Sequence, residues 1–163
     1  MLISTYQGLI AELGQSLNLS DMVAGDDGYV GLVVDGHEIH IQYDGQDSVV
    51  ILFTRLQEAD PDRREGIYTL LLGANLFWQG TRGATFSIDF DTGRIFLADR
   101  RALDSLDVDA ASAWIEAFAD VAGYWRDRID AVNDGGPLGD ADGLDESTPG
   151  EGLNGLPPGG TLA

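Results

Sequence analysis

The sequence predicts an α+β protein with the element order αβββαββα and a mostly antiparallel sheet. Two observations support this prediction. Apolar residues recur at helical spacing in three separate stretches, whereas the stretches between them read as strands bounded by short turn sequences. Because turns of two or three residues join antiparallel strands, most of the sheet should be antiparallel. At 163 residues, the chain is long enough for one domain with a substantial core.

The first four elements are expected to be one helix and three strands. The helix is expected at residues 4–17, where a Ser-x-x-Gln sequence has capping-box spacing and apolar residues share one helical face. The strands are expected at residues 29–34, 37–43 and 48–56. The dipeptides Asp35-Gly36 and Asp44-Gly45 are typical of the turns that connect such strands.

The remaining elements are a second helix, a hairpin and a third helix. The second helix is expected at residues 61–79, because Asp60 can cap it and proline is favoured at its first position. The hairpin is expected to pair residues 84–90 with 94–98. The third helix should begin near Asp107 and carry a buried apolar stripe. That stripe comprises Trp114, Phe118, Val121, Trp125 and Ile129.

The charge balance is strongly acidic. Against 28 acidic residues the chain has nine basic ones, all arginine, and its formal charge is −19. Nucleic acid and an anionic membrane surface are not expected as partners, because both require a basic surface. The chain has no cysteine or lysine, which excludes disulfides, thiol catalysis and Schiff-base chemistry, and no cofactor is expected. The N-terminus lacks the features of a signal peptide, so we expect a cytoplasmic protein.

The composition changes near residue 133. Residues 134–163 contain nine Gly, four of the five Pro, six acids and no aromatic residue. A segment of this composition cannot bury enough apolar surface to offset the entropy cost of ordering it. We therefore expect a folded domain at residues 1–133 and a disordered acidic Gly/Pro-rich tail at residues 134–163.

Three motifs resemble chemical sites, but each has a simpler interpretation. Asp91-Thr92-Gly93 has the sequence of the aspartic-protease triplet, yet these residues also favour a tight hairpin turn, which is the interpretation we adopt. His37 and His40 are three residues apart in an expected strand, so their side chains should point to opposite faces rather than bind one metal ion. Two acidic stretches, at residues 89–93 and 140–143, lack the remaining ligands of a calcium loop. No catalytic residue and no metal ligand is therefore expected.

The second helix is more apolar than a helix packed on one sheet requires. Nine of the twelve residues from Ile67 to Trp78 are apolar, and fully burying each large side chain contributes about 1.5–3 kcal/mol. Either this helix is central and fully buried in one chain, or a second copy of the chain covers part of it. We favour the second interpretation, because Gly73 and Ala74 would let another backbone approach closely.

The third strand is also apolar on both faces, since residues 49–53 read Val-Val-Ile-Leu-Phe. Antiparallel sheets commonly leave one face in water. Either helices cover both faces, or one face forms a half-open groove for another polypeptide, which could also add a strand to a sheet edge.

The sequence LLLGANLFWQGTRGATFSIDFDTGRIFLADR, followed by a helix carrying AWIEAFADVAGYWRDRI, resembles the class I type III secretion chaperones of the Tir-chaperone (CesT-like) family. The resemblance covers roughly residues 4–130. It depends on the order of an Asn-Leu-Phe helix end, a glycine corner, a hairpin and a final aromatic helix, with no catalytic signature among them. The tail after residue 133 departs from the compact members of that family.

The resemblance implies a small acidic homodimer without enzymatic activity in the bacterial cytoplasm. Its partner would be the N-terminal chaperone-binding segment of a secreted effector, and a secretion ATPase is a further candidate partner. The second helix and the neighbouring strands would form the dimer interface, with candidate residues Leu70, Leu71, Gly73, Ala74, Phe77, Trp78, Phe86 and Ile88. The positions that match cargo-contacting surfaces are Tyr6, Leu9, Leu13, Ile39, Ile41, Val50 and Leu52.

Two other functions stay open at this point. One is a regulatory adaptor on the same fold, which would titrate a secretion or transcription regulator. The other is an enzyme, a dimeric aspartic protease that would use Asp91.

Overall fold

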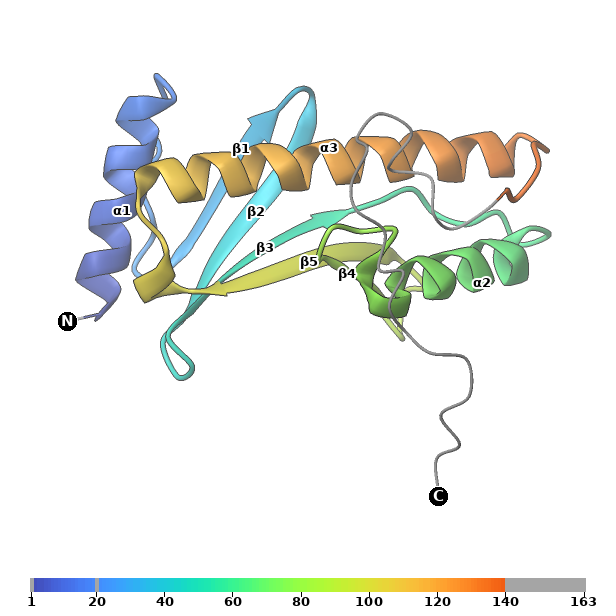
Figure 1. Ribbon diagram of the computed structural model, residues 1–163, viewed down its shortest axis with the longest axis horizontal. Coiled ribbons are helices and arrows are strands. Elements are labelled where there is room, and N and C mark those ends of the chain that lie inside the picture. Colours follow the sequence, from blue (N-terminus) through green and yellow to red (C-terminus); the bar gives the residue numbers. More distant parts are fainter. Residues whose placement is uncertain (1, 20, 140–163) are drawn as a thin grey trace, which may run out of the picture.

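The computed structural model describes residues 2–19 and 21–139, and its elements confirm the α+β class and the αβββαββα order (Figure 1). The elements are α1 (Leu2–Ser16), β1 (Tyr29–Val34), β2 (His37–Asp44), β3 (Val49–Arg55), α2 (Arg64–Asn75), the 3-10 helix η1 (Leu76–Trp78), β4 (Thr85–Ile88), β5 (Ile95–Ala102), the 3-10 helix η2 (Leu103–Ser105) and α3 (Val108–Asn133). The last strand, β5, continues four residues beyond the expected end at residue 98, because Val49 of β3 still pairs with Ala102.

The five strands form one sheet in the order β1-β2-β3-β5-β4, and every neighbouring pair is antiparallel. β1 and β4 are therefore its two edges. α3 lies along one face of this sheet (Figure 1). α1 lies near the N-terminal half of α3, and α2 lies near the C-terminal half of α3. We call the opposite surface of the sheet the open face.

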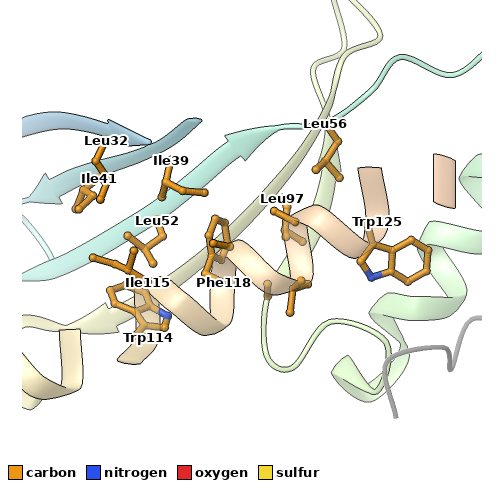
Figure 2. Packing of buried hydrophobic residues seen from close by; sticks show 14 of the residues in the cluster. Leu32, Ile39, Ile41, Leu52, Leu56, Leu97, Trp114, Ile115, Phe118 and Trp125 are labelled. Carbon is orange, nitrogen blue, oxygen red and sulfur yellow. The ribbon is translucent and has the colours of Figure 1, made fainter. Parts of the chain in front are cut away.

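The core lies between the sheet and α3. Alternate residues of the strands point toward this helix, so that Ile39 and Leu52 pack near Ile115 and Phe118 (Figure 2). All five residues of the stripe expected on the third helix are buried. The helix begins where expected, because the Asp107 side chain accepts a hydrogen bond from Ala110 N at 2.8 Å.

α2 is shorter than expected at both ends. Pro61 precedes the helix, in a turn in which the Asp60 carboxylate accepts a hydrogen bond from Asp62 N at 2.8 Å. The helix ends at Asn75, because Phe77 and Trp78 adopt left-handed backbone conformations with φ of 52° and 56°. These two aromatic residues therefore lie outside the helix that was expected to include them.

The alternation of β3 decides between the two interpretations of its apolar sequence. Val50 and Leu52 are buried toward α3, whereas Val49, Ile51 and Phe53 are half-buried on the open face. One face of this strand is therefore only partly covered in the single chain, and its use as a groove for another polypeptide stays a prediction.

Candidate protein-interaction site

The outer edge of β1 carries backbone groups that point away from the sheet. Tyr43 N donates a hydrogen bond to Gly28 O at 3.1 Å, and this bond fixes which residues of the first strand face β2. In an antiparallel ladder, residues that exchange hydrogen bonds with the neighbour alternate with residues that do not. The N–H and C=O groups of Gly31 and Val33 therefore point outward, and in the described part of the chain they have no hydrogen-bond partner.

A cleft of about 380 Å³ lies along this edge. Its lining comes from β1 and from the segment that follows α1: Asn18, Leu19, Asp21, Met22, Gly31, Leu32 and Val33. Outward backbone groups beside a cleft lined by both apolar and polar side chains supply both parts of a site for an extended peptide, namely ladder hydrogen bonds and a pocket for side chains. We call the outward groups of Gly31 and Val33, together with this cleft, the β1 edge site.

The open face continues from the β1 edge site as a row of stacked rings. Tyr29, His40 and Phe53 lie on successive strands, with ring centroids 5.9 Å and 4.9 Å apart. The Tyr29 hydroxyl is 2.7 Å from His40 Nδ1, which fixes the first pair. Because cross-strand neighbours on one face pack together, a strand added at β1 would place alternate side chains beside Tyr29 and the exposed Val33.

The surroundings of the β1 edge site are acidic. The first basic residue of the sequence is Arg55, so α1 and the first two strands contain none. Asp21 lines the cleft, and the exposed side chains of Asp27 and Asp35 flank β1. A surface with this charge attracts basic peptide segments and repels acidic ones.

A second exposed surface lies beside the other edge of the sheet. Six apolar side chains there are between 42% and 99% exposed: Leu72, Leu76, Phe77, Trp78, Ile88 and Phe90. Two contacts join the elements that carry these residues, because Asn75 is hydrogen-bonded to the backbone of Phe86 and the Tyr68 hydroxyl donates to Gly93 O at 3.4 Å. α2 therefore runs beside the β4–β5 hairpin (Figure 1). We call these six residues the α2–β4 patch.

The corner between α2 and β4 holds part of this patch in a fixed conformation. Phe77 and Trp78 have positive φ, which is uncommon for large side chains and persists where the surrounding structure fixes it. Here Trp125 Nε1 donates to Gly80 O at 2.8 Å, and Gly80 N donates to Ala74 O at 3.2 Å. Two aromatic side chains are thus presented to solvent by a backbone anchored in the core.

The structure divides the residues expected at a dimer interface. Four of them are buried in the subunit's own core, namely Leu70, Leu71, Ala74 and Phe86. The other four are exposed: Gly73, Phe77, Trp78 and Ile88. Three further exposed residues were not among the expected interface positions: Leu72, Leu76 and Phe90. The i, i+4 spacing of the two leucines places them on one helical face, but it does not show that this face is exposed, because the buried Ile67 and Leu71 have the same spacing.

The residues expected to contact cargo need a larger correction. Six of them are buried under α3 or α1 and cannot touch a partner in this structure: Tyr6, Leu13, Ile39, Ile41, Val50 and Leu52. Leu9 is half-buried in a groove between α1 and the start of α3. The apolar residues of the strands were chosen without asking which set α3 needs for its own packing, and the chosen ones are those that the subunit itself buries.

The Asp91-Thr92-Gly93 motif forms the tight hairpin turn that its residues favour. The Asp89 carboxylate accepts hydrogen bonds from the Thr92 hydroxyl at 2.5 Å and from Asp91 N at 3.1 Å. These two bonds, the Thr92 bond first, lower the pKa of Asp89. The exposed Asp91 carboxylate stands in a turn, and the side chain of Phe90 beside it points into solvent.

His37 and His40 lie on opposite faces of β2, as their spacing predicts. His37 Nδ1 contacts the guanidinium of Arg126 on the α3 side of the sheet. The same guanidinium donates to Thr54 Oγ1 and Arg55 O, each at 2.7 Å, and its burial lowers the pKa of Arg126. Arg126 therefore braces α3 against the sheet. Within the described ranges, no group of three His, Asp or Glu side chains is placed to hold a metal ion.

The fold and these surfaces are those of a protein-binding domain, with an open sheet edge on one side and an apolar patch on the other. The chain belongs to the Tir chaperone protein (CesT) family, which it matches over residues 8–126. The family resemblance found in the sequence is thereby confirmed. Among the described helices, none combines the length and the apolar character that a membrane span requires.

Three solved structures show the same fold. A chain of the HopA1–SchA chaperone–effector complex is 19% identical, with a TM-score of 0.65 over 77% of this chain and 95% of that one. A chain of the ExsC–ExsE complex is 20% identical, with a TM-score of 0.66 over 76% of this chain and 92% of that one. A chain of the ExoT–SpcS complex from Pseudomonas aeruginosa is 24% identical, with a TM-score of 0.55 over 74% of this chain and 96% of that one. A comparison with curated proteins finds no match.

Proposed function

We propose that this protein is a cytoplasmic type III secretion chaperone, which binds the N-terminal segment of a secreted effector and keeps it soluble and competent for secretion. The observation that carries the proposal is the β1 edge site, in a chain that belongs to the Tir chaperone family. The shared fold with a complex described as chaperone–effector supports it.

The effector segment is expected to bind as an extended strand. Gly31 and Val33 offer two N–H donors and two C=O acceptors to such a strand. Apolar side chains of the segment would enter the cleft beside Leu19 and Met22 or lie against Tyr29 on the open face. Basic residues in the segment would be attracted by the acidic side chains around the site.

This mode of binding needs no chemical step and no cofactor. A chaperone that binds one conformation of a client raises the population of that conformation by mass action. The apolar residues of the client are then covered, and the acidic chaperone domain keeps the complex soluble through charge repulsion. We therefore propose that the protein is not an enzyme.

We further propose that the protein is a homodimer whose two copies meet through the α2–β4 patch. Six exposed apolar side chains on adjoining elements are more apolar surface than a soluble monomer usually presents to water. Fully covering even three of them would contribute about 5–9 kcal/mol. A patch that covers a copy of itself satisfies the two-fold symmetry of most homodimers.

The folded domain and the tail are proposed to meet near the end of α3. Residues 134–139 still pack on the domain, since Leu138 lies against Gly66 and its C=O accepts a hydrogen bond from Arg128 at 3.0 Å. The remainder of the expected tail, residues 140–163, lies outside the described residues.

Coexpression with secreted proteins encoded beside its gene tests the proposed function. We expect copurification of one such protein, and loss of the complex when the N-terminal segment of that protein is deleted. Light scattering of the chain alone should give twice its mass of 17.4 kDa. Recovery of a transcription or secretion regulator in place of an effector would favour the adaptor function, and failure to bind any secreted partner would contradict the proposal.

A further inference from the structure

The outer edge of β4 is occupied by a side chain of α2. Phe86 N donates a hydrogen bond to Asn75 Oδ1 at 2.8 Å, and Asn75 Nδ2 donates to Phe86 O at 3.2 Å. Asp89 N donates to Arg94 O at 2.9 Å, which fixes which residues of β4 are hydrogen-bonded to β5. Because these residues alternate along the strand, the backbone N–H and C=O of Phe86 point away from β5. Of the two β4 residues whose backbone groups face outward, Phe86 and Ile88, the one nearer the centre of the strand therefore has both its N–H and its C=O paired with a side-chain amide.

An Asn side chain is suited to this role by its chemistry. Its amide has the same donor and acceptor as a backbone peptide group, so two bonds to one residue reproduce the pairing of a neighbouring strand. The position is fixed because Asn75 is the last residue of α2 and the chain then turns away at Phe77. Edge strands that are not covered in some way can pair with strands of other chains.

We infer that Asn75 is a specificity-determining residue that closes the β4 edge, so that other chains can extend the sheet only at β1. The inference depends on the proposed function in one respect, since it assigns the effector strand to a single edge. It also defines how two copies of the chain meet. With the β4 edge closed, they pack through side chains of the α2–β4 patch instead of joining their sheets strand to strand.

Three substitutions separate this role from a contribution to stability. Asn75→Ala removes both bonds and opens the edge. Asn75→Asp also loses the donor to Phe86 O, but it leaves a charged acceptor at the edge, which disfavours strand pairing. Asn133→Ala is the matched control, because the Asn133 side chain also makes two bonds to backbone, one from Asp60 N and one to Glu58 O, each at 2.8 Å.

The measurement is the weight-average mass of each purified chain over a range of concentrations. We expect Asn75→Ala to associate through β4, so that its mass rises with concentration to about twice that of the parent chain or more. Asn75→Asp and Asn133→Ala should keep the parent mass. An unchanged mass for Asn75→Ala, or an equal increase for all three variants, would overturn the inference.

A further variant covers the case in which Asn75→Ala is insoluble. Adding Ser87→Lys places a charge on the exposed side of β4 and should restore solubility if the aggregates form by strand pairing. If the double variant stays insoluble, Asn75 has a folding role only and the inference fails. The mass of the parent chain tests the proposed dimer, whereas the differences among the variants test the role of Asn75. A monomeric parent would therefore contradict the dimer without affecting the test of Asn75.

Discussion

The two edges of the sheet are built in opposite ways. At β1, the backbone groups of Gly31 and Val33 lie beside a cleft of mixed polarity in acidic surroundings. At β4, the backbone of Phe86 is paired with the Asn75 side chain, and apolar side chains of the α2–β4 patch stand around it. The first edge can recognise a polypeptide through its main chain, which tolerates many sequences. The second can recognise only a surface whose side chains fit.

This difference suits a chaperone that must combine a variable client with a constant partner. Backbone hydrogen bonds contribute about 0.5–1.5 kcal/mol each whatever the side chains are. Burial of specific apolar side chains contributes more per residue and depends on their shapes. In the proposed function, the edge that accepts an effector and the surface that meets a second copy are thereby kept apart on one small domain.

The largest expected effect contrasts two neighbouring leucines beside β4. Leu71 is 3% exposed, so Leu71→Asp buries a charge in the core and should leave the chain unfolded or insoluble. Leu72 is 70% exposed, so Leu72→Asp should fold normally and halve the mass measured by light scattering. Circular dichroism checks the fold of both variants. A folded Leu72→Asp chain that remains dimeric would show that the α2–β4 patch is not the interface.

Proline substitutions at the two edges test the assignment of the client strand. Val33→Pro removes an outward N–H without breaking the β1–β2 ladder, and should weaken effector binding about 2–12-fold. Ile88→Pro is the matched substitution on β4, where the N–H also points outward. Isothermal titration with the effector segment should show little change for it. Equal losses for the two variants would remove the distinction between the edges.

A smaller effect is expected at the contact between α1 and β2. The Tyr6 and Tyr43 rings stack with centroids 5.1 Å apart, and among the described residues neither hydroxyl has a hydrogen-bond partner. Tyr6→Phe should therefore raise the free energy of unfolding by about 1 kcal/mol. Chemical denaturation measures this change in the free energy of unfolding. Tyr124→Phe is the control, because the Tyr124 hydroxyl is hydrogen-bonded to Arg128. A destabilised Tyr6→Phe chain would show that this hydroxyl has a partner.

The same residue gives a pH dependence with a definite sign. Burial first, and the nearby charge of Asp27 second, raise the pKa of Tyr6 above its ordinary value near 10. Because the unfolded chain loses this proton more readily, stability should be retained below that value and fall as the pH rises above it. Tyr6→Phe should show a shallower fall of the thermal midpoint between pH 9 and 11, roughly the range in which tyrosine ionises. Identical slopes would contradict the assignment.

The smallest effect is expected at the β4–β5 turn. Hydrogen bonds from Thr92 and from Asp91 N lower the pKa of Asp89. A lowered pKa stabilises the fold above the ordinary value of Asp and loses that contribution as the pH falls through and below it. Asp89→Asn should therefore slightly reduce the decline of the thermal midpoint between pH 5 and 3, roughly the range in which carboxylates titrate. An unchanged decline would show that the carboxylate contributes nothing to this turn.

Local patterns were enough to predict most of the fold. The Asp-Gly turns fixed the hairpin of β1 and β2, and the apolar stripe from Trp114 to Ile129 fixed α3. The end of α2 was mispredicted, because the left-handed corner at Phe77 depends on a tertiary bond from Trp125 to Gly80 that no local pattern encodes.

The candidate site was harder to predict than the fold. β3 is apolar on both faces, so its sequence does not show which face α3 covers. β2 does contain that information, since the buried Ile39 and Ile41 alternate with His40 and Gln42. The identity of the edge strands could not be predicted, because β5 lies between β3 and β4 in the sheet although it follows them in the chain.

Backbone amide hydrogen exchange, measured by NMR with and without the bound effector segment, tests the central claim most directly. The outward amides of Gly31 and Val33 should exchange rapidly in the free chain and become protected at least about tenfold in the complex, because they enter a new ladder. The amide of Ile88 should keep its exchange rate. A stable complex in which Gly31 and Val33 exchange as fast as before would contradict strand addition at β1.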